Sequence, residues 1–146
     1  MPMFRPTRKR KKGEEPGDRF SNRRIRGIKR YVIESLMSAG ASTYPNEFGG
    51  ILRSEETGII TDILLIPGTT AGHRHANFQL YMLPVDLSVV GTAHSHPSGA
   101  LRPSEEDLSL FRRWGRLHII LGHPFMRSCW KAYDGQGEEV HLEVVR

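Results

Sequence analysis

The sequence has a single cysteine and no long apolar run. Cys129 cannot form an internal disulfide and has no second cysteine for a C-x-x-C zinc or redox pair, so we expect it to be a small buried hydrophobic residue. No apolar stretch reaches the roughly 18 to 20 residues that a membrane span requires. The basic N-terminus has neither the apolar segment nor the cleavage site of a secretory signal. We therefore expect a cytoplasmic protein without a membrane segment.

Acidic residues are scarce near the N-terminus. The first 30 residues hold 12 of the 21 Lys and Arg residues but 3 of the 16 Asp and Glu residues, so the remaining chain is mildly acidic. Residues 1–21 also contain Pro and Gly without apolar periodicity, which predicts a disordered basic tail before one domain over residues 22–146. Such a tail suits contacts with nucleic acid, through phosphate neutralisation, or with a protein partner.

Hydrophobic periodicity predicts the first elements of the domain. Apolar residues recur at helical spacing over residues 23–41, which predicts an amphipathic helix. Two β-rich runs, EFGGILRS from Glu47 and GIITDILLIP from Gly58, are separated by EET and predict a hairpin. Further strands are predicted to begin at Ala76, Ser88, Leu117, Cys129 and Glu139.

A second helix is predicted to begin near Ser104. In SEEDLSLFRRWGR, Leu108, Phe111 and Trp114 have helical spacing, and Gly115 suits a C-terminal cap. The Gly-rich stretch DGQGE predicts a turn between the last two strands, hence at least one antiparallel pair. Strands and helices therefore interleave, which predicts an α/β fold with a curved mixed β-sheet flanked by helices.

The stretch HSHPSGALRPSEED contains two histidines one residue apart. If His94 and His96 lie at the end of a strand, the side-chain period of two places both imidazoles on one face. Both rings can then reach one ion at the roughly 2.0 to 2.1 Å of a Zn–N bond. Pro97 ends the strand at this point, where a pocket can form. The spacing therefore favours a metal site.

Asp107 is the best candidate for a third ligand, because it lies in the first turn of the helix that begins near Ser104. The alternative is that Ser104 and Asp107 form a capping-box-like helix start that needs no metal. The two roles are compatible, since Ser104 can accept a backbone N–H while its hydroxyl donates elsewhere. A site with three protein ligands leaves one position open for water, whose pKa a zinc ion lowers toward about 7.

That water also needs a base that does not occupy the open position of the metal. Glu47 is a candidate because it begins an otherwise apolar strand, although an exposed strand start would explain it equally well. The other acids are weaker candidates. Glu55 and Glu56 lie in the apparent turn, and Glu105 and Glu106 suit a helix N-terminus, where the dipole favours negative charge.

These residues together resemble the signature of the JAMM, or MPN-plus, metalloproteases. The signature is a glutamate, then H-S-H-P, six residues, a serine, two residues and an aspartate, and this chain matches it at Glu47, His94, His96, Pro97, Ser104 and Asp107. The stretches RPSEEDLSLF and GEEVHLEVV are similar to compact stand-alone archaeal members. The similarity in the order of elements extends over residues 23–146.

The resemblance implies a cytidine-deaminase-like fold, one zinc ion per chain, and hydrolysis of the bond after the C-terminal glycine of a ubiquitin-like protein or its conjugates. It implies that His94, His96 and Asp107 bind the metal. It also implies that Glu47 acts as general base and then general acid, and that Ser104 stabilises the oxyanion.

Several alternatives remain open on the sequence alone. The substrate can be a ubiquitin-like conjugate or a sulfur-carrier protein that needs C-terminal processing, and the chain can instead be a non-catalytic MPN scaffold. A second H-x-H, His73 and His75, has no serine or aspartate in register behind it. We expect His118, His123 and His141 to be strand or turn residues. The zinc deaminases are excluded because the H-x-E and P-C-x-x-C pattern is missing.

Overall fold

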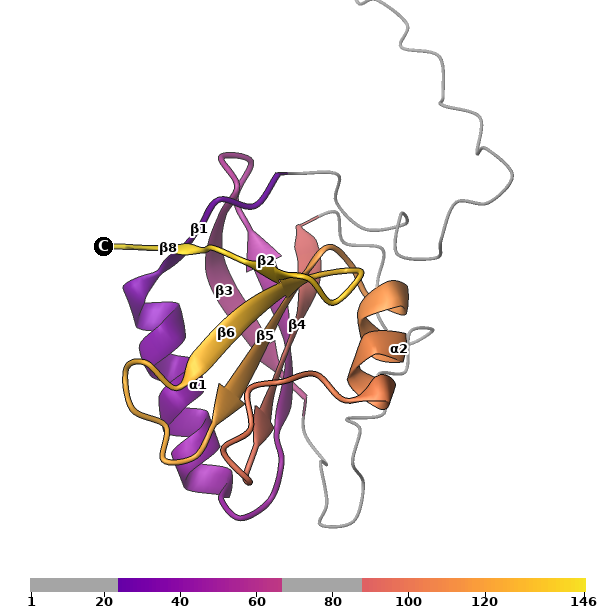
Figure 1. Cartoon of the computed structure of the whole chain (residues 1–146). Helices are drawn as coiled ribbons and strands as arrows, with labels where there is room; N and C mark the ends of the chain where they lie inside the picture. The colour runs from indigo at the N-terminus through magenta and orange to yellow at the C-terminus, as the bar shows by residue number, and fades with distance from the viewer. Residues whose placement is uncertain (1–23, 67–87) are drawn as a thin grey trace, which may run out of the picture.

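The chain forms strands where β-branched and apolar residues cluster between turns, and two helices cover the sheet (Figure 1). The computed structural model describes residues 24–66 and 88–146. The elements in chain order are β1 (Gly27–Lys29), α1 (Arg30–Thr43), β2 (Gly49–Ser54), β3 (Ile59–Leu65), β4 (Val89–His96), α2 (Glu105–Arg113), β5 (Leu117–Gly122), β6 (Trp130–Asp134), β7 (Glu139–Val140) and β8 (Glu143–Val145). The predicted tail over residues 1–21, the strand expected from Ala76, and His73 and His75 lie outside the described residues.

The eight strands form one mixed sheet in the order β7-β6-β5-β4-β2-β3-β1-β8. Three neighbouring pairs are parallel, namely β4 with β5, β1 with β3, and β1 with β8. The other neighbouring pairs are antiparallel. β7 and β8 lie at opposite ends of this order although His141 and Leu142 alone separate them in the chain. The sheet must therefore curl until its two edges approach each other, as Figure 1 shows.

The two helices pack on opposite faces of the sheet. Ile119 and Leu121 of β5 join the larger core with α1, whereas Ile120 between them packs with Phe111 of α2 and Tyr133 of β6. This alternation along β5 is the side-chain period of a strand buried on both faces. It confirms the predicted curved mixed sheet flanked by helices.

Neither helix in the described part of the chain has the length and apolar character needed to cross a bilayer.

The prediction of a helix from residue 23 is wrong for its first turns. Gly27–Lys29 form the strand β1, and the helix runs from Arg30 to Thr43. Ile28 is fully buried between the neighbouring strands, and a Cβ on Gly27 would lie 3.0 Å from the Glu143 carbonyl oxygen. Pairing with distant strands therefore overrides the local helical periodicity.

The single strand predicted from Glu139 is two strands with different partners. β7 pairs with β6, which confirms the predicted final hairpin, and β8 pairs with β1 at the other edge. Cys129 was expected to be buried, and this is wrong. Its side chain is half-buried, because it ends a turn in which its N–H donates to the Met126 carbonyl (2.8 Å) just before β6 begins.

Candidate metal centre

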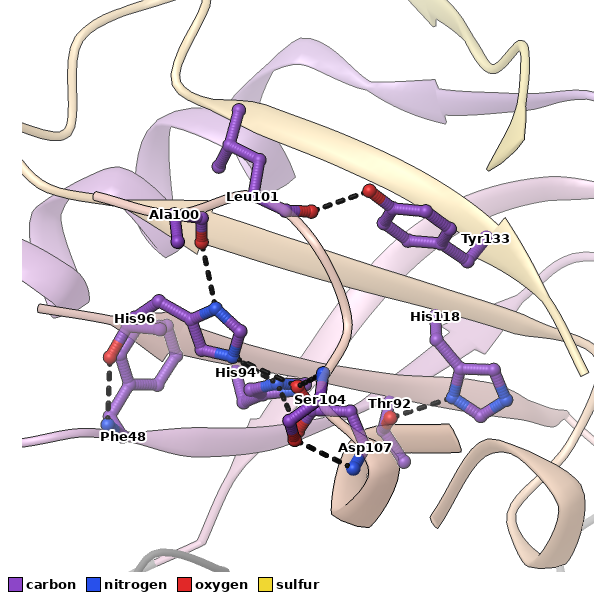
Figure 2. Close-up of polar contacts among 11 residues, drawn as sticks. Phe48, Thr92, His94, His96, Ala100, Leu101, Ser104, Asp107, His118 and Tyr133 are labelled. Atoms are coloured by element: carbon purple, nitrogen blue, oxygen red, sulfur yellow. Dashed lines mark hydrogen bonds and ion pairs between the residues drawn. The ribbon is translucent and has the colours of Figure 1, made fainter. Parts of the chain in front are cut away.

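The two histidines of the H-x-H pair lie at the C-terminal end of β4, which is hydrogen-bonded to β2 on one side and β5 on the other. Both imidazoles point to the α2 face of the sheet (Figure 2), with the Nε2 atoms of His94 and His96 3.1 Å apart. The chain then turns away, since the Gly99 N–H donates to the His96 carbonyl (3.0 Å). This turn requires glycine, because Gly99 has a φ of +84°.

Asp107 reaches both imidazoles from the first turn of α2. Its Oδ1 lies 2.9 Å from Nε2 of His94, and its Oδ2 lies 3.0 Å from Nε2 of His96. Ser104 is the N-cap residue of this helix. Its Oγ accepts the Asp107 N–H (3.1 Å), while its own N–H donates to Asp107 Oδ2 (2.8 Å). The capping box and the proposed ligand position thus coexist, because the cap points the carboxylate toward β4.

The three side chains fit a zinc ion. The two imidazole Nε2 atoms are 3.1 Å apart, and each faces a different oxygen of the Asp107 carboxylate, at 2.9 Å for His94 and 3.0 Å for His96. Atoms that share one tetrahedral zinc at roughly 2.0 to 2.1 Å stand about 3.3 Å apart, which is close to these separations. Within the described ranges, His94, His96 and Asp107 form the one cluster of His, Cys, Asp or Glu side chains that could hold a metal. Two imidazoles and one carboxylate are the ligands of a catalytic zinc site with a fourth position open.

Hydrogen bonding prepares His96 for coordination. Its Nδ1–H donates to the Ala100 carbonyl (2.7 Å), which in the neutral ring leaves the Nε2 lone pair directed at the cluster. Burial acts to lower the pKa of His96, but the hydrogen bonds to Asp107 and Ala100 and the charges of Asp107 and Glu47 raise it above 6.5. Hydrogen bonds from both imidazoles outweigh burial and hold the pKa of Asp107 well below its usual range.

His94 is held differently from His96. Its Nδ1 is buried and has no hydrogen-bond partner among the described residues, while its Nε2 faces Asp107. Metal coordination through Nε2 requires the proton to sit on Nδ1. The orientation of this ring therefore depends on packing, including Phe111, whose ring centroid lies 6.2 Å away.

Glu47 lies two residues before the start of β2 and is half-buried. The ladder pairs Gly49 with His94, and Phe48 continues it, because its N–H donates to Ser95 Oγ (2.9 Å) and its carbonyl accepts the Ser95 N–H (3.1 Å). Extending this register by one residue places Glu47 opposite His96, on the same face of the sheet. Its charge acts on His96, so it stands beside the three converging atoms without joining them.

The other predicted acids lie elsewhere. Glu55 and Glu56 are exposed in the turn between β2 and β3, at the opposite end of β2 from Glu47, and Glu105 and Glu106 are exposed in the first turn of α2. Ser104 is exposed and uses its oxygen as a hydrogen-bond acceptor, so its O–H can still donate. The five polar residues of the predicted signature thus lie at one end of the sheet.

His118 was expected to be a strand or turn residue, and it does lie in β5. The hydrogen bonds that its buried ring makes behind the metal centre were not predicted. It is fully buried and paired with Thr92, two residues before His94. Its Nε2–H donates to the Gly115 carbonyl (3.1 Å), and its Nδ1 accepts from the Thr92 hydroxyl (2.7 Å). Burial lowers the pKa of His118 to about 3. A lone histidine in an apolar strand carries no sequence pattern that reveals such bonds.

His123 and His141 lie outside the centre. His123 stacks on Tyr44, with ring centroids 4.3 Å apart, and His141 lies between β7 and β8. Sequence reasoning also missed the Ala100 carbonyl, because a backbone acceptor is independent of residue type. It could have been found only from the loop geometry.

Known proteins share this fold and this centre. The sequence profile of prokaryotic homologues of the JAB domain matches residues 29–133. A protein of Haloferax volcanii described as a "Probable metalloprotease" is 39% identical over 135 residues, which cover 86% of this chain and 83% of the relative.

Two solved structures have the same fold as this chain. One, described as a JAMM metalloprotease-like zinc site in the proteasome and signalosome, superposes with a TM-score of 0.66 and 38% identity over 84% of this chain and 99% of that one. A JAB1/MPN domain protein from Archaeoglobus fulgidus has a TM-score of 0.66 and 36% identity over 83% and 97% of the two chains. With the geometry of His94, His96 and Asp107, these similarities show that the chain belongs to the JAB/JAMM family of zinc metalloproteases.

Proposed function

We propose that this metalloprotease hydrolyses the isopeptide or peptide bond that follows the C-terminal glycine of a ubiquitin-like protein, with one zinc ion per chain. The observation that carries the proposal is the convergence of the His94 and His96 imidazoles on the Asp107 carboxylate, with each Nε2 atom within 3.0 Å of one of its oxygens and with Glu47 opposite His96. The family supports peptide-bond chemistry, and the match to the JAMM signature supports the substrate class.

Zinc bound at these three residues supplies a Lewis acid that polarises the scissile carbonyl and makes water nucleophilic near neutral pH. Glu47 accepts the proton of the attacking water, because its charge acts on His96 and it lies outside the ligand cluster. The same carboxylate then protonates the departing amine. Ser104 donates its O–H to the developing oxyanion, while the capping bond from the Asp107 N–H fixes the position of its oxygen.

The first test replaces the proposed base with its neutral isostere. Glu47→Gln should keep zinc binding, because Glu47 is not a ligand, and should reduce kcat by about 100-fold or more through loss of general acid-base catalysis. Zinc content is measured by elemental analysis, and turnover is measured on a lysine conjugate of a ubiquitin-like protein. Glu56→Gln is the matched control, since Glu56 is exposed in the turn at the far end of β2. Full activity of Glu47→Gln with bound zinc would exclude the proposed base.

A second arm separates the two substrate classes. The wild-type protein is incubated with the conjugate and, separately, with a sulfur-carrier protein extended beyond its C-terminal glycine, each with and without a zinc chelator. Chelator-sensitive cleavage of the conjugate supports deconjugation. Cleavage of the extended carrier alone would replace the isopeptidase role with C-terminal processing, and no cleavage of either by the zinc-loaded protein would contradict the proposed substrate class.

A further inference from the structure

The loop between β4 and α2 carries the hydrogen-bond acceptor that orients His96. The Ala100 carbonyl accepts the His96 Nδ1–H at 2.7 Å, and Ala100 comes from a loop that is neither strand nor helix. Its position must therefore be set by contacts with other elements. The Ala100 N–H bonds to Ser98 Oγ (3.3 Å) within the loop, which does not anchor the loop to the sheet.

Two contacts attach this loop to the sheet. At the end of β5, a Cβ on Gly122 would lie 2.8 Å from the Gly99 carbonyl oxygen and 2.9 Å from Leu101 Cδ2, so the loop rests directly on the strand. The second contact is a hydrogen bond, in which the Tyr133 hydroxyl of β6 donates to the Leu101 carbonyl. Figure 2 shows Tyr133 pointing across to Leu101, one residue beyond the carbonyl that holds His96.

Tyr133 is itself fixed in place. The residue is 5% exposed, its ring packs against Phe111 with centroids 6.1 Å apart, and it pairs with His118 across β5 and β6. Burial and the nearby charge of Glu139 raise its pKa, which keeps the hydroxyl protonated as a donor. A buried side chain of β6, the second strand from one end of the sheet, is thus bonded to the residue next to Ala100.

We propose that Tyr133 is a positioning residue for the metal centre. It bonds to the Leu101 carbonyl and thereby holds the Ala100 carbonyl where it fixes the ring orientation and tautomer of His96. This inference rests on the metal-dependent function proposed above. Partners that orient a ligating histidine typically contribute 10-fold to 100-fold to metal affinity. Because Tyr133 acts through one further residue, we expect about a tenfold effect, at the lower end of that range.

Tyr133→Phe tests the proposal, because it removes the hydroxyl and keeps the ring that packs on Phe111. The chain offers a matched control in Tyr31, whose hydroxyl also donates to a backbone carbonyl, that of Thr61 in β3. Tyr31→Phe removes the same kind of bond away from the metal centre. Zinc dissociation constants of the wild type and both variants are measured by competition with a chromogenic chelator. The visible spectrum of each cobalt-substituted protein reports ligand geometry, and the melting temperature of each metal-free protein reports folding.

The expected result is a zinc dissociation constant about tenfold higher for Tyr133→Phe, with an altered cobalt spectrum, and wild-type values for Tyr31→Phe. Equal zinc affinity and equal spectra in Tyr133→Phe and the wild type would overturn the proposal. So would an equal loss of affinity in both variants, since that would reflect general stability. Absence of zinc binding in the wild type would instead contradict the proposed function, so the two failures are distinguishable.

Discussion

Acid should destabilise the metal-free protein through one buried histidine behind the centre. His118 is fully buried, and burial lowers its pKa to about 3, against 6.5 for an ordinary histidine. The unfolded chain therefore binds a proton at His118 that the folded protein does not bind between these two values. Its contribution to stability is fully present above pH 6.5 and is lost as the pH falls through this window.

The loss can be estimated from the shift. Each pH unit within the window costs about 1.4 kcal/mol, so at about pH 4.5, two units below 6.5, the free energy of unfolding falls by about 3 kcal/mol. This is a large share of the roughly 5 to 15 kcal/mol that stabilises a typical domain. Neither of two other groups with shifted pKa values adds to this loss at about pH 4.5. The depressed pKa of Asp107 matters below its ordinary value of 3.8, and the raised pKa of His96 acts in the opposite direction.

Comparison with a variant that cannot titrate at this position isolates the effect. Urea unfolding of the metal-free protein is measured at about pH 7 and 4.5 for the wild type and for His118→Gln. The variant is less stable at neutral pH, because it disturbs the bonds to Thr92 and Gly115. Its free energy of unfolding should nevertheless fall by about 3 kcal/mol less than that of the wild type over this interval. Equal losses in the two proteins would refute the reasoning.

Two further substitutions test the centre and the sheet. Asp107→Asn keeps an oxygen that can accept the Ser104 N–H but removes the charge of the ligand. Zinc affinity, measured by competition titration, should therefore fall by more than about 100-fold, while circular dichroism should show that α2 persists. Wild-type zinc affinity in this variant would exclude Asp107 as a ligand. Gly91→Ala places a Cβ 1.5 Å from the Leu117 carbonyl oxygen. It should lower the free energy of unfolding, measured by urea unfolding, by more than about 3 kcal/mol. A loss below about 1 kcal/mol would contradict the close approach of β4 and β5.

The sequence determined the features that depend on local spacing. The period of two in a strand brings His94 and His96 to one face, and a serine three residues before an acid predicts the helix start that carries Asp107. Both are confirmed, with the two imidazoles and the carboxylate within hydrogen-bonding distance of each other. Such patterns are readable because neighbouring residues alone decide which way the side chains point.

Tertiary structure decided the features that depend on distant partners. Residues 27–29 are a strand and not a helix because β3 and β8 flank them, and the C-terminal residues divide between two edges of a curled sheet. The position of Glu47 opposite His96 follows from the register of β2 and β4, and the bond from Tyr133 to the loop crosses from β6. Pairing energies between segments far apart in the chain set these positions, and no local pattern encodes them.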